Sequence, residues 1–201
     1  MTTTDLPPDL TLAGCLTRQQ RLRDYLQSAG LDAALIADPG HVYYFTNFWA
    51  RLVYQPIFFL PASGPTILCV PGEESDSWIA DEQRAYPSNR LCTLEDDQPR
   101  QSMSTIAGEI SSCRRIGCDD APRPWLLNGA NCEDLVGTLM NMRRAKDPDE
   151  LEVIRHCITG CEAAFECARE VVQPGVSEVE IHASMHRAAI IAVGEAIGEF
   201  G

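Results

Sequence analysis

The sequence predicts an α/β domain, built on a mixed sheet flanked by helices, followed by two helices that begin a second domain. Short apolar segments rich in β-branched and aromatic residues alternate with helix-like segments over residues 13–138, which favours a layered arrangement. From about residue 143 the pattern is helical throughout. We therefore divide the 201 residues into an N-terminal arm (1–12), an α/β domain (13–138) and a linker with two helices (139–201).

The α/β domain is expected to open with a helix over residues 15–29, because apolar residues recur there at helical spacing and Gly30 is suited to end it. The next segment, LDAALIA (31–37), is a short apolar run typical of a buried strand, and an Asp-Pro-Gly turn ends it. Residues 41–49 (HVYYFTNFW) are rich in aromatic and β-branched residues, which predicts a second strand or a strand that leads into a loop.

The middle of the domain has the composition of a hairpin followed by alternating elements. PIFFLP (56–61) and TILCVP (66–71) are strand-like, and the short, turn-rich connection between them favours a β-hairpin. Residues 73–84 begin with acids, which helix N-termini prefer, and they predict a helix. For the rest of the domain we predict a helix over 103–112, a strand over RRIGCDD (114–120) and a helix over NCEDLVGTLMNM (131–142).

Two strongly signalled helices follow. Asp147, Pro148 and Glu150 supply an N-cap acid, a proline at the first helical position and the glutamate of a capping box. Apolar residues then recur at steps of three and four, which predicts an amphipathic helix of about seven turns: Leu151, Ile154, Ile158, Cys161, Phe165, Ala168 and Val172. A Pro-Gly pair ends this helix, and a second capping box at 177–180 opens another that runs to about residue 193.

Composition and charge exclude several classes of protein. Apolar residues make up 45% of the chain and charged residues 22%, which excludes a disordered or collagen-like chain. The net charge of −13 repels phosphate groups, so we expect neither a nucleic acid nor an anionic membrane as a partner. The sequence contains no run of eighteen apolar residues, so we expect no membrane-spanning helix.

Cysteine is frequent, with nine residues in the chain. The number is odd, no CxxC pair occurs, and the first residues lack the pattern of a secretory signal. We therefore expect a reduced, cytoplasmic protein in which most cysteines are small buried apolar residues. Cys157, Cys161 and Cys167 lie on the first C-terminal helix, where core packing is our interpretation and a metal or redox cluster is the alternative.

Other polar groups could carry chemistry, but none forms a recognised catalytic set. His182 and His186 share a helix face, yet the HASMH sequence lacks the glutamate of a zinc-binding HExxH pair, so we interpret them as a partly exposed face. We expect the acids at 95–97 and at Asp119–Asp120 in solvated loops beside turns. Because phosphate-binding loops and the GxSxG elbow are absent too, we assign no catalytic, cofactor-binding or metal-ligating residue.

Aromatic residues are unusually dense between residues 43 and 54. We expect Tyr43, Tyr44 and Phe45 to pack in the core. Trp49 and Arg51 are candidates for contact with a substrate or a partner subunit, because aromatic and arginine residues are enriched in interfaces and arginine is rarely buried without a partner. An ordinary packed position is the alternative for both.

Three stretches of the sequence, taken in order, resemble one family. The segment 18–49, with its GLDA at 30–33 and YYFTNF at 43–48, resembles the opening of the creatinase/prolidase N-terminal domain. The segment 142–165 resembles the entry to the pita-bread catalytic domain of that family, and 171–181 resembles its next step. The matching residues of these two segments are Arg144, Lys146, Glu150, Ile154, Arg155, Pro174, Gly175, Ser177, Glu178 and Ile181.

The resemblance implies a creatinase N-terminal-like domain followed by the start of a truncated pita-bread domain. Members are commonly homodimeric Xaa-Pro peptidases that act on small peptides and hold Mn, Co, Fe or Zn with two Asp, one His and two Glu. Those ligands lie downstream of the last matching segment, and this chain stops at Gly201. We therefore expect a non-catalytic portion that serves dimerisation and closure of the substrate site, with Trp49 and Arg51 in that role.

Two other functions remain open at this level. The parent protein could be a creatinase-like hydrolase of C–N bonds or another non-peptidase member of the same fold. Alternatively, the chain could be a complete product that acts only as a binding or dimerisation module.

Overall fold

Within the described residues, a six-stranded sheet forms the centre of Thr11–Ala145, the first of two units into which the chain divides. The computed structural model describes residues 9–49, 55–72, 75–87, 98–119, 127 and 129–195. The second unit contains the two C-terminal helices. None of the helices described is both long enough and apolar enough to cross a membrane.

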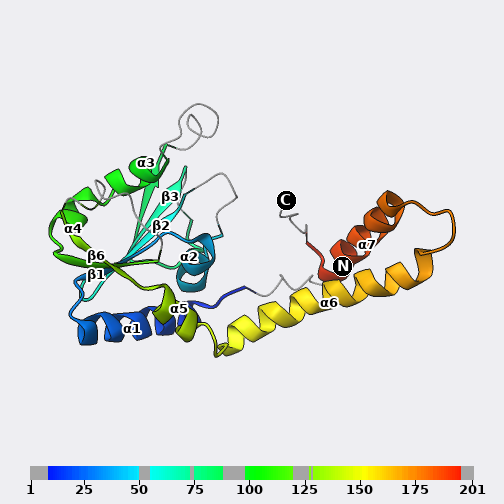
Figure 1. Ribbon diagram of the computed structural model, residues 1–201, viewed down its shortest axis with the longest axis horizontal. Coiled ribbons are helices and arrows are strands. Elements are labelled where there is room, and N and C mark those ends of the chain that lie inside the picture. Colours follow the sequence, from blue (N-terminus) through cyan, green and yellow to red (C-terminus); the bar gives the residue numbers. More distant parts are fainter. Residues whose placement is uncertain are drawn as a thin grey trace. The chain divides into compact units, whose positions relative to one another are not determined.

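The sheet is mixed, as predicted. Its strands are β1 (Ala33–Ile36), β2 (Ile57–Pro61), β3 (Ile67–Pro71), β4 (Glu82–Tyr86), β5 (Arg115–Cys118) and β6 (Asn131–Asp134). They lie side by side in the order β4-β3-β2-β1-β5-β6, and Figure 1 shows β2 and β3 next to each other. β2 runs antiparallel to β1 and β3, whereas the β1–β5, β3–β4 and β5–β6 pairs are parallel. The predicted hairpin is therefore confirmed as β2 and β3.

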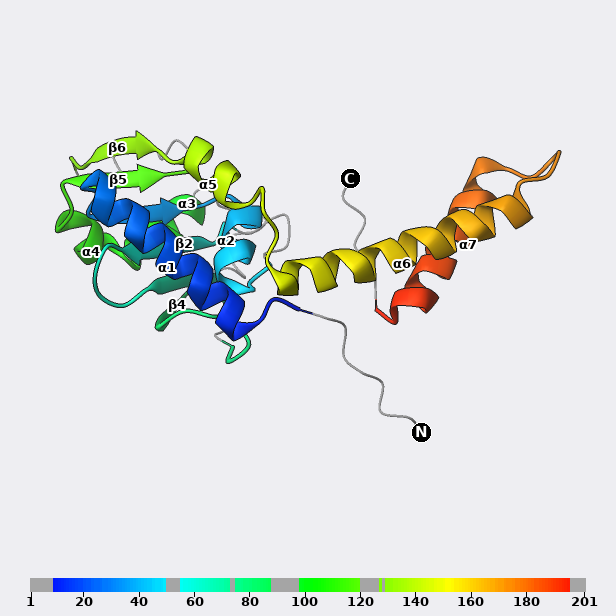
Figure 2. The ribbon, with the colours of Figure 1, turned by 90° about the horizontal axis from the view of Figure 1, so that it is seen from below.

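Helices cover both faces of this sheet (Figure 2). They are α1 (Leu12–Ala29), α2 (Pro39–Thr46), α3 (Gln98–Ser104), α4 (Ala107–Ser111) and α5 (Val136–Met142). Ala34 and Ile36 of β1 pack into a core shared with α1, α2 and α5, whereas Leu35 packs into a second core with α3 and α4. Because both faces are buried, every residue of β1 is buried, which explains its uninterrupted apolar sequence.

Residues 41–49 do not form the predicted strand, because α2 occupies most of them. The side chain of Asp38 accepts a hydrogen bond from the backbone N–H of His41 (2.9 Å), and Pro39 stands in the first turn, so the segment starts as a capped helix. Of the three aromatic residues expected in the core, Tyr44 and Phe45 are buried on this helix, whereas Tyr43 is only partly buried.

The helix predicted over residues 73–84 is also wrong, because β4 begins within that segment and pairs with β3. The carboxylate of Asp81 accepts hydrogen bonds from the backbone N–H (2.7 Å) and the hydroxyl (2.9 Å) of Thr66, which fixes the start of β4 beside β3. Two further elements differ in detail. The helix predicted over 103–112 is the pair α3 and α4, and the segment 131–142 begins as β6 before it continues as α5.

Asp32, in the GLDA motif, ties β1 to β5. Its carboxylate accepts hydrogen bonds from the backbone N–H groups of Arg114 (2.7 Å) and Arg115 (2.9 Å). These two bonds hold the pKa of Asp32 below its usual value. Arg115 also donates to Glu133 on β6 (2.8 Å), so charged groups link three neighbouring strands at the end where they begin.

The second unit is a pair of packed helices, α6 (Pro148–Val171) and α7 (Glu178–Val193). Both predicted capping boxes are confirmed: Glu150 accepts the N–H of Asp147 (3.0 Å), and Glu180 accepts the N–H of Ser177 (2.9 Å). The helices meet at Gly160, where a Cβ atom would lie 2.8 Å from the Val193 side chain, so the close approach requires glycine.

An apolar stripe on α6 is exposed in the described structure. We use this name for Leu151, Ile154, Ile158, Phe165 and Val172, whose exposed fractions run from 38% to 63%. Cys157 and Cys161 are exposed as well, so the expectation that these cysteines are core residues is wrong. A helix of this amphipathic pattern needs a partner for its apolar face, and α7 covers a different side, around Gly160.

Candidate functional site

The candidate site is the end of α2, which carries Trp49. Arg51, the second residue singled out in the sequence, lies outside the described residues. The position of Trp49 depends on how α2 is held, and three polar side chains from distant parts of the sequence hold it at both ends.

Asp119 holds the start of α2. It follows β5, and because β1 and β5 are parallel their C-terminal ends lie together, which brings its carboxylate to the turn between β1 and α2. One oxygen accepts the N–H of Ala37 (2.7 Å), while the other accepts the N–H of Asp38 (3.1 Å) and lies 2.9 Å from Nδ1 of His41. The prediction of a solvated Asp119 is wrong, since its side chain is fully buried. Asp120 and residues 95–97 lie outside the described residues.

Two residues of α1 hold the end of α2. Arg18, which is completely buried, donates from Nε to the carbonyl of Tyr44 (2.7 Å). Gln19 donates from Nε2 to the carbonyls of Phe45 (2.9 Å) and Ile79 (3.1 Å). Carbonyls in the last turn of a helix lack partners within the helix, and the positive charge of Arg18 also suits the negative end of the helix dipole.

The chain leaves α2 through a sharp turn that separates two aromatic side chains. Asn47 adopts a left-handed conformation (φ 59°), which ends the helix. Phe48 is buried, with its ring centroid 4.4 Å from that of Trp78. Trp49 is 48% exposed, and its ring meets that of Tyr43 edge-on with centroids 5.9 Å apart. Phe48 therefore anchors the turn while Trp49 remains accessible for contact.

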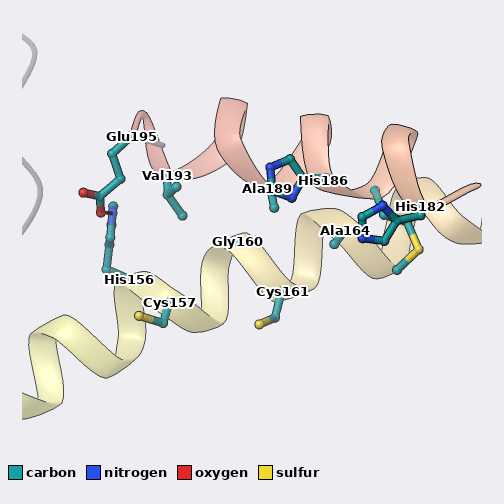
Figure 3. Close-up of a pocket in the computed structure, with 11 residues that line it drawn as sticks. His156, Cys157, Gly160, Cys161, Ala164, His182, His186, Ala189, Val193 and Glu195 are labelled. Carbon is teal, nitrogen blue, oxygen red and sulfur yellow. Dashed lines mark ion pairs between the residues drawn. The ribbon is translucent and has the colours of Figure 1, made fainter. Parts of the chain in front are cut away.

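A second surface lies between α6 and α7, where a groove of about 390 Å³ is lined mainly by apolar atoms (Figure 3). The rings of His182 and His186 are nearly parallel there, with centroids 6.1 Å apart. His156 lies on α6, with Nε2 3.3 Å from a carboxylate oxygen of Glu195. Figure 3 shows the sulfur of Cys161 pointing away from the two stacked rings.

The chemistry of the two surfaces differs from that of a metal centre. Among the residues that the structure describes, no three His, Cys, Asp or Glu side chains are placed to hold a metal ion. What the end of α2 offers is an accessible aromatic ring on a rigid support, which suits binding to an apolar group or to another protein.

Comparison with known proteins identifies the family. The model of the creatinase/prolidase N-terminal domain matches residues 18–128, more than half of the chain. A search of curated proteins finds no match to this chain.

Solved structures share the fold. A prolidase from Pyrococcus horikoshii OT3 has a TM-score of 0.67 at 16% identity, with 87% of this chain and 48% of that chain covered. An Xaa-Pro dipeptidase from Bacillus anthracis has a TM-score of 0.66 at 16% identity, with the same coverage. A proline dipeptidase from Streptococcus pneumoniae TIGR4 has a TM-score of 0.52 at 20% identity, with 64% of this chain and 98% of that chain covered.

The chain thus spans about half the length of the first two proteins. These matches confirm the predicted fold class and the resemblance found in the sequence. The chain belongs to the creatinase/prolidase N-terminal domain family.

Proposed function

We propose that this chain is the N-terminal portion of a metal-dependent Xaa-Pro peptidase of the prolidase or aminopeptidase P type, and that it is not itself catalytic. One observation carries the proposal. The family model ends at residue 128, whereas the likeness to the Pyrococcus prolidase covers 87% of the chain, more than the N-terminal domain alone. A small peptide is the proposed substrate of the parent protein.

In this proposal the chain supplies contacts, and the rest of the parent supplies the metal. Bound Mn, Co, Fe or Zn would polarise the scissile carbonyl and activate a water molecule. The described residues offer no donor set that fits such an ion, so we assign no catalytic step to them. We also propose a cytoplasmic location, where thiols stay reduced; the eight cysteines in the described part of the chain form no disulfide.

We assign Trp49 and Arg51 to contact with a second subunit in a homodimer, close to the substrate site that this subunit helps to close. The support for Trp49 is structural. Its ring is half exposed, while Phe48 and the polar contacts at both ends of α2 fix the backbone that carries it. A side chain held this way loses little entropy on binding, which favours a role in recognition.

The chain alone should show no metal-dependent peptidase activity. The assay is release of proline from an Xaa-Pro dipeptide in the presence of added manganese, with and without a chelator. No turnover is expected, because the described chain offers no site for the Lewis acid. Chelator-sensitive turnover that survives a second purification would contradict the proposal. A version extended into the downstream coding sequence is the positive control. If the extended version turned over creatine and not the dipeptide, the result would favour the creatinase-like alternative.

Replacing Trp49 with alanine should weaken self-association about tenfold while the melting temperature changes little. The ring is half exposed, so its removal opens no cavity in the core, yet an aromatic anchor at a subunit contact contributes on the order of 1–2 kcal/mol. Sedimentation equilibrium gives the dimer dissociation constant. Met140→Ala removes a similarly exposed apolar side chain from α5 and serves as the control. If the two variants and the unmodified chain had equal dissociation constants, Trp49 would not be part of the interface.

A further inference from the structure

Two cysteines lie on neighbouring strands of the sheet. Cys118 is the last residue of β5, and Cys132 is the second residue of β6. The parallel register places Cys132 opposite Ile116 and Asp134 opposite Cys118. Since side chains alternate along a strand, Cys118 and Cys132 share one face of the sheet as diagonal neighbours.

The Cys132 thiol influences the pKa of Cys118. Burial is the main cause that raises the pKa of Cys118, and the neighbouring Cys132 thiol raises it further. Other cysteines contact different groups: the Arg18 guanidinium lies 3.2 Å from the sulfur of Cys15, and the Thr105 hydroxyl lies 3.0 Å from that of Cys69. Among the described cysteines whose pKa is clearly shifted, Cys118 is thus the one on which a second thiol acts.

The environments of the two thiols are complementary. Cys118 is 3% exposed and belongs to the core beneath α3 and α4, whereas Cys132 is exposed to solvent. An oxidant therefore meets Cys132 first, and the buried Cys118 is positioned to react next.

We propose that Cys118 and Cys132 form a reversible disulfide under oxidising conditions, which makes this edge of the sheet a redox-sensitive site. With hydrogen peroxide as the oxidant, the Cys132 thiolate attacks one peroxide oxygen, the O–O bond breaks, and a sulfenic acid and hydroxide result; the hydroxide takes up the proton that the thiol released on ionisation and becomes water. The Cys118 thiol then attacks the Cys132 sulfur, the S–O bond breaks, and the thiol proton leaves with the hydroxide as a second water. Two thiols are oxidised and one peroxide is reduced.

The geometry predicts a strained, easily reduced bond. Disulfides usually join Cα atoms about 4.4–6.8 Å apart, whereas diagonal neighbours in a sheet lie about 7–8 Å apart. The backbone must therefore shift when the bond forms. β6 lies at the edge of the sheet, with no residue fully buried, so a shift of this strand along β5 displaces no buried side chain (Figure 2). Strained disulfides have higher reduction potentials and serve as labile, regulatory bonds.

The sequence provides a direct readout. Trypsin does not cut at Arg123, because proline follows, so residues 116–143 remain one peptide that contains these two cysteines and no other. The full chain is treated with a few equivalents of hydrogen peroxide, alkylated under denaturing conditions and digested. We expect most of this peptide to carry no alkyl group and to be two hydrogens lighter than the reduced, unalkylated peptide. Treatment with dithiothreitol before alkylation should restore both alkyl groups.

Two variants make the test specific. Cys132→Ser alters an exposed residue and should abolish the cross-linked peptide while Cys118 becomes alkylated. The double change Cys157→Ser and Cys161→Ser removes two exposed thiols from α6 and should leave the cross-link unaffected. The inference fails if peroxide leaves both cysteines of the peptide alkylated. It also fails if Cys132 proceeds to sulfinic acid or pairs with a cysteine other than Cys118.

Discussion

Replacing Asp119 with alanine should lower the free energy of unfolding of the α/β unit by about 3 kcal/mol. The change leaves two backbone N–H groups at the start of α2 without their acceptor and removes the carboxylate beside Nδ1 of His41. Each buried polar group that loses its partner costs about 1–3 kcal/mol. Guanidinium unfolding followed by circular dichroism gives the difference.

Two further variants separate the effect of the contacts from that of the charge. Asp119→Asn keeps the shape and one strong acceptor, so about half of the loss is expected. Asp76→Ala removes an exposed acid from the same unit and should change the free energy of unfolding by less than about 0.5 kcal/mol. Similar losses for Asp119→Ala and Asp76→Ala would show that the carboxylate does not hold α2 in place.

Local signals were enough to predict those elements whose determinants lie close together in the sequence. The start of α6 at Asp147 and that of α7 at Ser177 are set by capping boxes within four residues, and both are confirmed. The hairpin of β2 and β3 depends on a turn between two apolar runs. In these cases the sequence and the folded structure favour the same local conformation.

Distant contacts decided the elements that were predicted wrongly. The composition of residues 41–49 suits a strand, but Arg18 and Gln19, each 26 residues away, satisfy the last carbonyls of α2 and make a helix the better solution. Asp119 looked like a loop acid because His41, 78 residues away, could not be recognised as its partner. A pattern of three to four residues carries no information about such pairs.

The candidate site shows the same limit. The density of aromatic residues drew attention to Trp49, but nothing local distinguishes it from Phe48, and the burial of Phe48 depends on Trp78, thirty residues away. The exposure of Cys157 and Cys161 has a related origin. Helical periodicity shows that a face is apolar, and it leaves open which surface covers that face.

The exposed apolar stripe of α6 should drive the chain to form dimers at micromolar concentration. Phe165 is 63% exposed and Ile158 48%, and contiguous apolar surface of this kind is typical of interaction sites. A second copy presents the same stripe, so a two-fold contact buries both at once, and this closed symmetry limits the assembly to two chains. Light scattering coupled to size exclusion should give twice the mass of the 22.1 kDa chain, falling on dilution.

The double change Ile158→Glu and Phe165→Glu should make the chain monomeric at every concentration tested. Burying a carboxylate in an apolar contact without a partner costs several kcal/mol, which weakens association at least about 100-fold. Thr159→Glu is the matched control, because it adds the same charge to α6 roughly 120° around the helix from Phe165, and it should leave the dimer intact. A monomeric mass for the unmodified chain that does not change on dilution would show that the stripe does not bind a second copy. A dimer that survives the double change would place the contact elsewhere, and the Trp49 variant would then show whether the end of α2 forms it.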